Sequence, residues 1–300
     1  MNTELVINGT NIKKTFKNFE LNIPELKIPK GFATALVGEN GAGKTTLINI
    51  LTGVKLDYKG SIRYFDKYTD ADRETKPELK NAIGYTGTSQ YFFPQWTAAN
   101  IEEINTILFD SFSSEKFRAM CDELAIFPEG GFKGKVKVSE MSDGMKTKIA
   151  LAGVWARDTQ LLILDEPASP LDPLMRDKLN RMISEYIESG NGERSVFTST
   201  HNIADMEAVT DYVIIMERGA IVEEGFVEDL KEKYVLVKGE NTDADKAAPA
   251  MYTFNKSQHG WDGICLAENV DKLAGLDIVT ETPSLSQICV AVMKQNSRLK

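Results

Sequence analysis

The nine residues from Gly38 to Thr46 have the types and spacing of a phosphate-binding loop. The segment reads Gly38, Glu39, Asn40, Gly41, Ala42, Gly43, Lys44, Thr45, Thr46. Glycines let several backbone N–H groups point at one anion, and the start of a following helix adds the positive end of its dipole. The Lys44 ammonium can reach the β- and γ-phosphates of a nucleotide, and the Thr45 hydroxyl can bind Mg²⁺. The segment therefore predicts a nucleoside triphosphate site in preference to an ordinary glycine-rich turn.

Two adjacent carboxylates, Asp165 and Glu166, follow the apolar run 161–164. Four consecutive aliphatic residues are typical of a strand buried on both faces of a parallel sheet. Such sheets bind ligands at the carboxyl ends of their strands. Because successive side chains on a strand point in opposite directions, the two acids need different roles. Asp165 is suited to Mg²⁺, directly or through water, and Glu166 to orienting or deprotonating an attacking water.

Four other residues could contact a nucleotide, although each also has an ordinary structural explanation. Ser142 and Gly144 precede an apolar helical pattern and could bind an anion, but a simple helix cap explains them equally well. His201 follows the strand-like segment 195–200 and could donate a hydrogen bond to a γ-phosphate or serve the fold alone. The ring of Phe16 could stack on adenine or belong to the core.

Apolar patterns predict the elements that must position these residues. Residues 33–37 form a strand that leads directly into the phosphate-binding loop, and apolar residues at helical spacing follow the loop. The sequence predicts further strands at 82–85, 161–164, 195–200, 212–216 and 220–222 and helices at 98–109, 114–126 and 174–187. Strands that alternate with helices favour an α/β fold.

Composition excludes several classes of function. The formal charge of −9 argues against a nucleic-acid-binding surface, so we expect no nucleic-acid partner. No apolar run reaches the ~18 residues that a membrane-spanning helix needs, and the N-terminus lacks the pattern of a signal peptide. Three scattered cysteines fit a reducing cytosol. We therefore expect a cytoplasmic protein that reaches a membrane only through a partner.

The motifs occur in the order found in one family, and residues 5–234 or so resemble the ATPase subunit of ATP-binding cassette (ABC) transporters. The resemblance implies a P-loop NTPase (RecA-like) core with a mostly parallel sheet, an antiparallel β-subdomain and an inserted α-helical subdomain. It places the nucleotide-binding domain at residues 1–237, with the helical subdomain at about 89–156. Residues 238–300 form a C-terminal accessory region with α+β character, which includes a predicted amphipathic helix that begins at Pro283.

The same resemblance implies ATP and Mg²⁺ as cofactors and assigns the site. Residues 141–145 correspond to the signature motif of the family. Two identical subunits are expected to pair head-to-tail, so that Ser142 and Gly144 in the signature of one subunit cap the ATP bound by the other. The implied catalytic residues are Lys44, Glu166 and His201. The implied metal ligands are Thr45 and Asp165. The implied nucleotide-binding residues are Phe16, Gly38, Asn40, Gly41, Ala42, Gly43, Lys44, Thr45, Thr46, Ser142, Gly144, Met145.

Three positions depart from the family pattern. Thr88 occupies the place of a glutamine that senses Mg²⁺ and water, and Gln90, two residues on, could substitute for it. Asp143 replaces a glycine of the signature, where its carboxylate could favour the helix dipole or weaken phosphate attraction. Pro170 stiffens a turn at the expected dimer seam.

The resemblance also implies a transmembrane permease subunit as partner. We expect it to dock near the aromatic segment that contains Tyr91, Phe92, Phe93 and Trp96. The DGMK form of the signature and the short C-terminal region look similar to bacterial exporters of antimicrobial peptides, peptide toxins of the phenol-soluble modulin type, or drugs. Two alternatives stay open: a non-transport ABC ATPase that acts on ribosomes or DNA, and a nucleotide-binding regulator with little turnover.

Overall fold

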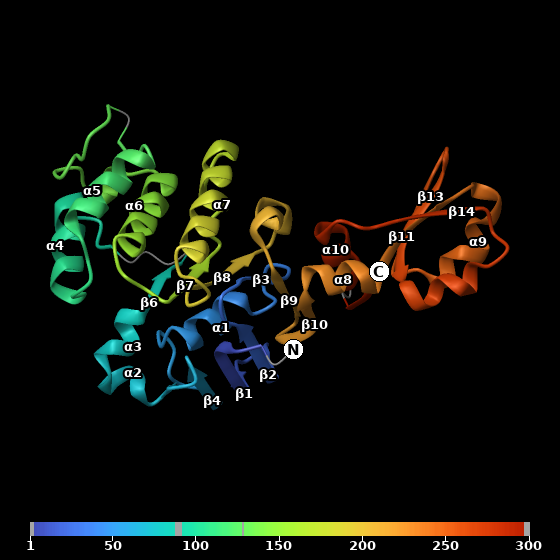
Figure 1. Ribbon diagram of the computed structural model, residues 1–300, viewed down its shortest axis with the longest axis horizontal. Helices are drawn as coiled ribbons and strands as arrows, with labels where there is room; N and C mark the ends of the chain where they lie inside the picture. The colour runs from blue at the N-terminus through green and yellow to red at the C-terminus, as the bar shows by residue number, and fades with distance from the viewer. Residues whose placement is uncertain (1–2, 88–91, 128, 297–300) are drawn as a thin grey trace.

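The computed structural model describes residues 3–87, 92–127 and 129–296. A six-stranded sheet in the order β10-β9-β3-β8-β7-β6 forms its centre (Figure 1). All neighbouring pairs in it are parallel except β10 and β9, which form an antiparallel hairpin. Every residue of β3, β7 and β8 is buried, which accounts for the continuous apolar run at residues 161–164 of β7. Its strands are β3 (Ala33–Val37), β6 (Ile83–Thr86), β7 (Leu161–Asp165), β8 (Ser195–Thr200), β9 (Tyr212–Glu217) and β10 (Ala220–Phe226).

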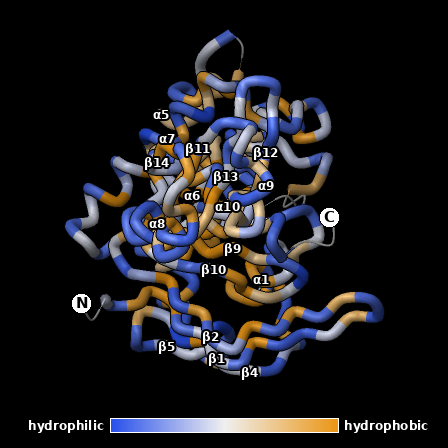
Figure 2. The backbone as a smooth tube through the Cα atoms, turned by 90° about the vertical axis from the view of Figure 1, so that its right-hand side faces the viewer, coloured by the Kyte–Doolittle hydropathy of each residue, from blue (hydrophilic) through white to orange (hydrophobic). Residues whose placement is uncertain are grey.

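A second, antiparallel sheet in the order β2-β1-β4-β5 forms a separate layer (Figure 2). Helix α1 (Lys44–Leu51), which follows the phosphate-binding loop, is buried between the two sheets: its residues Leu47 and Ile50 belong to one apolar cluster with residues of both. The strands of the second sheet are β1 (Leu5–Thr15), β2 (Glu20–Pro29), β4 (Lys59–Tyr64) and β5 (Tyr68–Thr69), and the short helices α2 (Asp72–Thr75) and α3 (Pro77–Ala82) follow them.

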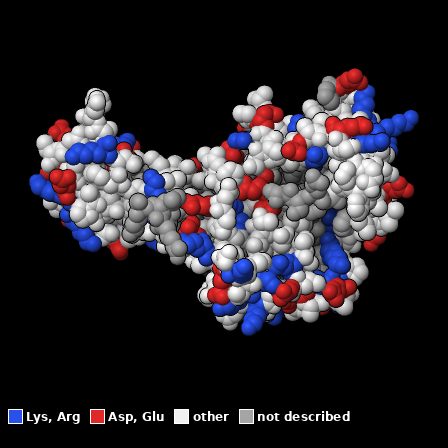
Figure 3. Space-filling model, turned by 180° about the vertical axis from the view of Figure 1, so that it is seen from behind, with Lys and Arg blue, Asp and Glu red and all other residues white. Residues whose placement is uncertain are grey.

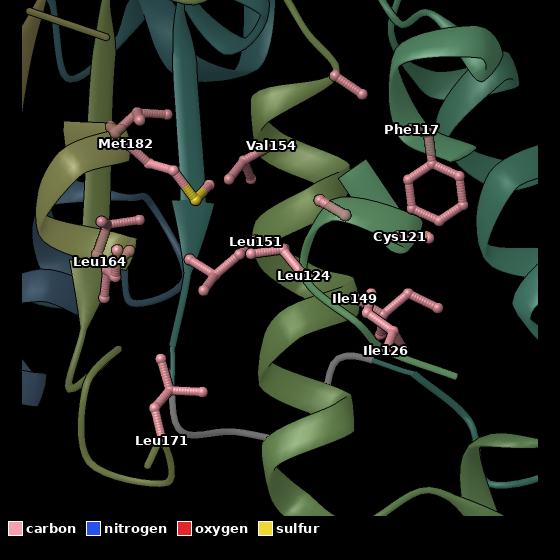
Figure 4. Packing of buried hydrophobic residues seen from close by; sticks show 14 of the residues in the cluster. Phe117, Cys121, Leu124, Ile126, Ile149, Leu151, Val154, Leu164, Leu171 and Met182 are labelled. Carbon is pink, nitrogen blue, oxygen red and sulfur yellow. The ribbon is translucent and has the colours of Figure 1, made fainter. Parts of the chain in front are cut away.

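A helical subdomain is inserted between β6 and β7. The side chains of Phe117 and Cys121 meet α6 from one side, while Leu164 of β7 and Met182 of α7 lie on its other side (Figure 4). Helix α6 is therefore packed against both the subdomain and the central sheet. The helices are α4 (Ala98–Leu108), α5 (Ser114–Glu123), η1 (Val138–Glu140), α6 (Asp143–Trp155) and, after β7, α7 (Pro173–Glu188).

The C-terminal accessory region contains a third, antiparallel sheet in the order β12-β13-β11-β14. Its last helix returns to the central sheet, where Leu285 and Ile288 are buried in one cluster with Val213 and Ile215 of β9. The predicted apolar stripe of this helix thus packs inward. Helix α8 (Val227–Lys233) precedes this region, whose elements are β11 (Tyr234–Gly239), η4 (Asn241–Asp243), α9 (Ala244–Ala247), η5 (Ala248–Ala250), β12 (Thr253–Ser257), β13 (Gly260–Leu266), η6 (Ala267–Leu273), β14 (Ile278–Glu281) and α10 (Leu285–Asn296).

The predicted domain boundary can be placed relative to the observed strands, and one predicted helix start differs from the observed one. The predicted domain boundary between residues 237 and 238 falls inside β11, because Val237 and the residues beside it pair with β13 and β14 as one continuous strand. Helix α10 begins at Leu285 rather than at Pro283, and Ser284 immediately before it accepts a hydrogen bond from the Gln287 N–H. The predicted fold class is confirmed by the observed sheets. Within the described residues, no helix is long and apolar enough to cross a bilayer.

Candidate functional site

The phosphate-binding loop joins β3 to α1 and requires glycine at two positions. Gly41 and Gly43 have φ angles of 88° and 107°, in the left-handed region that glycine adopts without strain. A Cβ atom at Gly43 would also lie 2.8 Å from the Phe19 ring, so this position has no room for a side chain. Gly43 is the N-cap of α1, which directs the amino end of the helix at the loop.

The Lys44 side chain lies across the loop that it belongs to. Its Nζ donates hydrogen bonds to the carbonyl oxygens of Gly38 (2.7 Å) and Glu39 (3.3 Å). Lys44 is only 6% exposed, and its Nζ is also 3.5 Å from a carboxylate oxygen of Glu166. A buried ammonium group therefore lies at the phosphate-binding loop, where phosphate oxygens could replace these carbonyl oxygens as its hydrogen-bond acceptors.

The parallel pairing of β7 with β8 brings Glu166 and His201 together. Asp165 is opposite Ser199 in the register, so the residues that follow each strand leave the sheet at the same edge. Glu166 has a φ of 52°, an uncommon conformation for a residue other than glycine. Its N–H donates to Ser199 Oγ at 3.0 Å, and its carboxylate is 2.7 Å from His201 Nδ1. Glu166 thus lies between a buried lysine and a histidine.

Asp165 has the features of a metal ligand. It is 3% exposed, and its Oδ1 accepts a hydrogen bond from Ser199 Oγ at 2.5 Å. Its Oδ2 is buried and has no hydrogen-bond partner among the described residues. Thr45 lines the same cavity. Mg²⁺ binds through one or two protein oxygens together with water and substrate phosphates, so this sparse oxygen set fits it. Accordingly, the described residues contain no group of three His, Cys, Asp or Glu that could hold a metal by themselves.

A cavity of about 1280 Å³ connects these groups. Phe16 lies at its edge, 38% exposed, with the ammonium groups of Lys14 and Lys55 at 5.7 and 5.0 Å from the ring centroid. The cavity is lined by ten of the predicted site residues: Phe16, Asn40, Gly41, Gly43, Lys44, Thr45, Thr46, Asp165, Glu166 and His201. Gly38, Ala42, Ser142, Gly144 and Met145 are described but do not line it. Thr88 and Gln90 lie outside the described residues.

The predicted signature residues form the start of α6. Ser142 is the N-cap, and its Oγ accepts a hydrogen bond from the Met145 N–H at 3.2 Å. A Cβ atom at Gly144 would lie 3.2 Å from the Pro170 carbonyl oxygen, so a larger residue would crowd this turn. The Asp143 carboxylate is 88% exposed and 3.1 Å from Lys146 Nζ. Its negative charge is therefore balanced within the helix.

Several residues that line the cavity or hold its lining residues were missed by reasoning from the sequence. Ser199 holds both Asp165 and the Glu166 backbone, yet its only signal was a hydroxyl in a strand two residues before His201. Lys146 and Thr147 lie one turn into α6 and line the cavity, which the helix spacing after Asp143 could have indicated. Phe92, Asp143 and Pro170, which the sequence had indicated for other reasons, also line the cavity. The remaining lining residues, which were missed, are Asn18, Phe19, Thr86, Gly87, Val138, Ala150, Pro167 and Ser169.

Known proteins share this sequence pattern. Residues 21–169 match the ABC transporter family. An uncharacterized ABC transporter ATP-binding protein of Synechocystis is 31% identical over 79% of this chain and 66% of its own length. An energy-coupling factor transporter ATP-binding protein of Methanospirillum hungatei is 31% identical over 71% of this chain and 53% of its own length. The L-cystine import ATP-binding protein of Bacillus subtilis is 26% identical over 74% and 90%. The chain thus spans about half to two thirds of the first two relatives.

Solved structures agree on the fold. A dimeric bacterial ABC transporter cassette superposes with a TM-score of 0.62 at 22% identity, over 73% of this chain and 98% of that one. About a quarter of this chain is not covered by that structure. From the family match, the shared identity and the order of motifs around one cavity, we conclude that the chain belongs to the ABC transporter family as an ATP-binding subunit.

Proposed function

We propose that this chain binds ATP with Mg²⁺ in the described cavity and hydrolyses it. The observation that carries the proposal is the placement of the Glu166 carboxylate between Lys44 (3.5 Å) and His201 (2.7 Å) at the phosphate-binding loop. The Lys44 ammonium would exchange its two loop carbonyls for phosphate oxygens, whose charge it neutralises. Glu166 is then free to orient a water for in-line attack or to accept its proton.

His201 and Asp165 would complete this site. The His201 ring is 45% exposed, so it can contact a γ-phosphate while its Nδ1 stays with Glu166. Bound Mg²⁺, held by Asp165 Oδ2 and the Thr45 hydroxyl, would supply charge neutralisation for the phosphates. The ring of Phe16 offers a planar apolar face for adenine.

We further propose that two copies pair head-to-tail around ATP. Ser142 is exposed and Gly144 half-buried, and neither lines the cavity of its own chain. The amino end of the 13-residue helix α6 favours an anion, and Ser142 and Gly144 at this end lie outside the cavity lining, although Asp143 beside them lines it. A second copy could supply this helix end, with Met145, to the γ-phosphate.

A membrane permease subunit is the proposed partner of this dimer, and docking would hold the chain on the inner face of the cell membrane. Phe93 is 58% exposed and packs edge-on against Trp96, with ring centroids 5.0 Å apart. The exposed Phe93 ring, which packs on the half-buried Trp96, supports an apolar contact at this position. Tyr91, part of the same predicted segment, lies outside the described residues. On the face of the molecule shown in Figure 3, Lys and Arg side chains are interspersed with Asp and Glu.

For the transported substrate we propose a peptide toxin, an antimicrobial peptide or a drug, moved outward. This proposal depends on the DGMK signature and on the short accessory region. One relative is named for L-cystine import, so direction is the first quantity to measure. The test uses membrane vesicles that contain this chain together with its membrane subunit. ATP-dependent accumulation of a labelled peptide in the lumen of inside-out vesicles would support export. Accumulation that requires right-side-out vesicles would overturn it.

ATP turnover tests the chemistry. Glu166→Gln removes the carboxylate charge and keeps the shape, so we expect turnover with Mg²⁺ to fall ~100-fold or more while ATP still binds. Glu188→Gln, an exposed glutamate on α7, is the matched control and should keep wild-type turnover. Equal turnover in wild type and Glu166→Gln would overturn the role of Glu166, and co-purification with ribosomes instead of membranes would favour the non-transport alternative.

A further inference from the structure

The segment that carries His201 connects β8 to β9 and is held from two sides. We define residues 201–210 as the switch segment; it includes the short helices η2 (Ile203–Asp205) and η3 (Glu207–Val209). On one side it is tied to α7: the Asp205 carboxylate is 2.7 Å from Arg176 Nη1, and the Asn180 side-chain amide donates to the Asp205 carbonyl at 2.9 Å. This contact belongs to the nucleotide-binding core.

On its other side the switch segment is tied to α10, the last helix of the chain. The Glu207 carboxylate accepts hydrogen bonds from the backbone N–H groups of Leu285 (2.8 Å) and Ser286 (3.3 Å). These N–H groups lie in the first turn of a 12-residue helix, where they have no partner within the helix and where negative charge is favoured. Glu207 is therefore a charged cap supplied from a distant part of the sequence.

Apolar packing reinforces this contact. Ile203, 3% exposed, shares one buried cluster with Leu285 and Ile288 of α10. The Cys289 thiol lies in the same cluster, and burial together with the negative charge of Glu207 raises its pKa to about 12. The switch segment and α10 thus meet through both a carboxylate cap and a closed apolar contact.

Helix α10 is the element through which the chain returns from the accessory region to the core. After α8 the chain builds the sheet β12-β13-β11-β14 and only then comes back as α10. Helix α10 contacts β9, α8 and η2 in the core and β12 and β13 in the accessory sheet, so it lies at the junction of the two (Figure 1). The accessory region is joined to the rest of the molecule through a narrower waist (Figure 3). A rotation of the accessory sheet would therefore displace α10.

We propose that Glu207 is a positioning residue for His201, through which the accessory region sets the rate of ATP hydrolysis. The inference rests on the ATPase activity proposed above. Because Glu207 fixes the switch segment against α10, the orientation of the His201 ring at Glu166 depends on where α10 lies. Glu207 does not line the nucleotide cavity, so its loss changes the rate of turnover and leaves ATP affinity unchanged.

Steady-state kinetics of the purified full-length chain with Mg²⁺ and ATP test this role. We expect Glu207→Ala to lower kcat about tenfold with KM for ATP within twofold of wild type, because a small displacement of a catalytic group is costly. Glu207→Gln keeps one acceptor oxygen and should recover part of the loss. Ser284→Ala is the matched control: it removes another cap of α10, the hydrogen bond from the Gln287 N–H, without touching the switch segment, and should keep wild-type kcat.

A double-mutant comparison separates positioning from general damage. If Glu207 acts through His201, then adding Glu207→Ala to His201→Ala should change single-turnover hydrolysis by less than twofold. If the two substitutions instead lower the hydrolysis rate independently, so that their factors multiply in the double mutant, the inference is overturned. It is also overturned if Ser284→Ala lowers kcat as much as Glu207→Ala does, or if Glu207→Ala raises KM for ATP. Active wild type with an equally active Glu207→Ala would overturn this inference alone, whereas a wild type without turnover would overturn the proposed ATPase activity as well.

Discussion

The nucleotide-binding core and the accessory region use the chain in opposite ways. In the core, short contiguous segments carry the chemistry: Lys44 and Thr45 follow directly on the loop glycines, and Asp165 and Glu166 are neighbours at the end of β7. The accessory region has no such segment. Its sheet is held by backbone pairing and by small apolar clusters, and it reaches the segment that carries His201 through α10, which contacts Glu207 and Ile203.

This difference indicates separate roles for the nucleotide-binding core and the accessory region. Local backbone geometry positions the phosphate-binding groups, so a few adjacent residues define them. The accessory region acts at a distance, through a helix whose partner residues are about 80 positions earlier in the chain. Changes in the core should therefore abolish nucleotide chemistry, and changes in the accessory region should alter stability or rate.

The largest effect is expected in the core. Lys44→Ala removes the buried ammonium that faces the phosphates and should weaken ATP binding by ~100-fold. Equilibrium titration with a fluorescent ATP analogue measures this loss. Lys116→Ala, an exposed lysine on α5, should bind as wild type does. Affinity within threefold of wild type for Lys44→Ala would show that the loop does not carry nucleotide binding.

An intermediate effect is expected at the junction of the two regions. Ile288 on α10 is fully buried, so Ile288→Ala should destabilise the fold by about 2–4 kcal/mol through lost burial and a residual cavity. Val290 on the same helix is 40% exposed, and Val290→Ala should change stability by less than about 0.5 kcal/mol. Urea unfolding followed by circular dichroism compares the two. Equal midpoints would mean that α10 is not anchored to the central sheet.

The smallest effect concerns the thiols, one in the helical subdomain and two in the accessory region. Burial raises the pKa of Cys121 and of Cys289 to about 12, and burial also raises the pKa of Cys265. The folded thiols should therefore stay protonated at pH 8–9 and react with a thiol reagent only after unfolding. Absorbance of the released reagent, with and without urea, measures this.

The same shifts make stability depend on pH. Above about pH 8.5 the unfolded chain releases thiol protons that the folded chain retains, so the free energy of unfolding should fall as pH rises and be highest, with respect to these groups, below that value. Rapid labelling of the folded protein at pH 8 would contradict the buried placement of the thiols.

Much of the fold followed from patterns in the sequence. The runs that end at Val37, Asp165 and Thr200 were predicted as buried strands, and β3, β7 and β8 lie there. The accessory boundary did not follow, since the polar segment after β11 resembles a linker, although it forms η4 and α9 of a folded unit. The residues of β11 do not by themselves indicate that this strand continues across the change in composition, because its partner strands β13 and β14 come later in the chain.

The sequence by itself determined the phosphate-binding loop, the acidic strand end and the family, because these depend on residues adjacent in the chain. Only the tertiary structure decided that Ser199 holds Asp165, that Glu166 lies between Lys44 and His201, and that Glu207 caps α10. The physical reason is that each of these contacts joins segments far apart in sequence, and parallel strand pairing and helix packing bring them within hydrogen-bond distance.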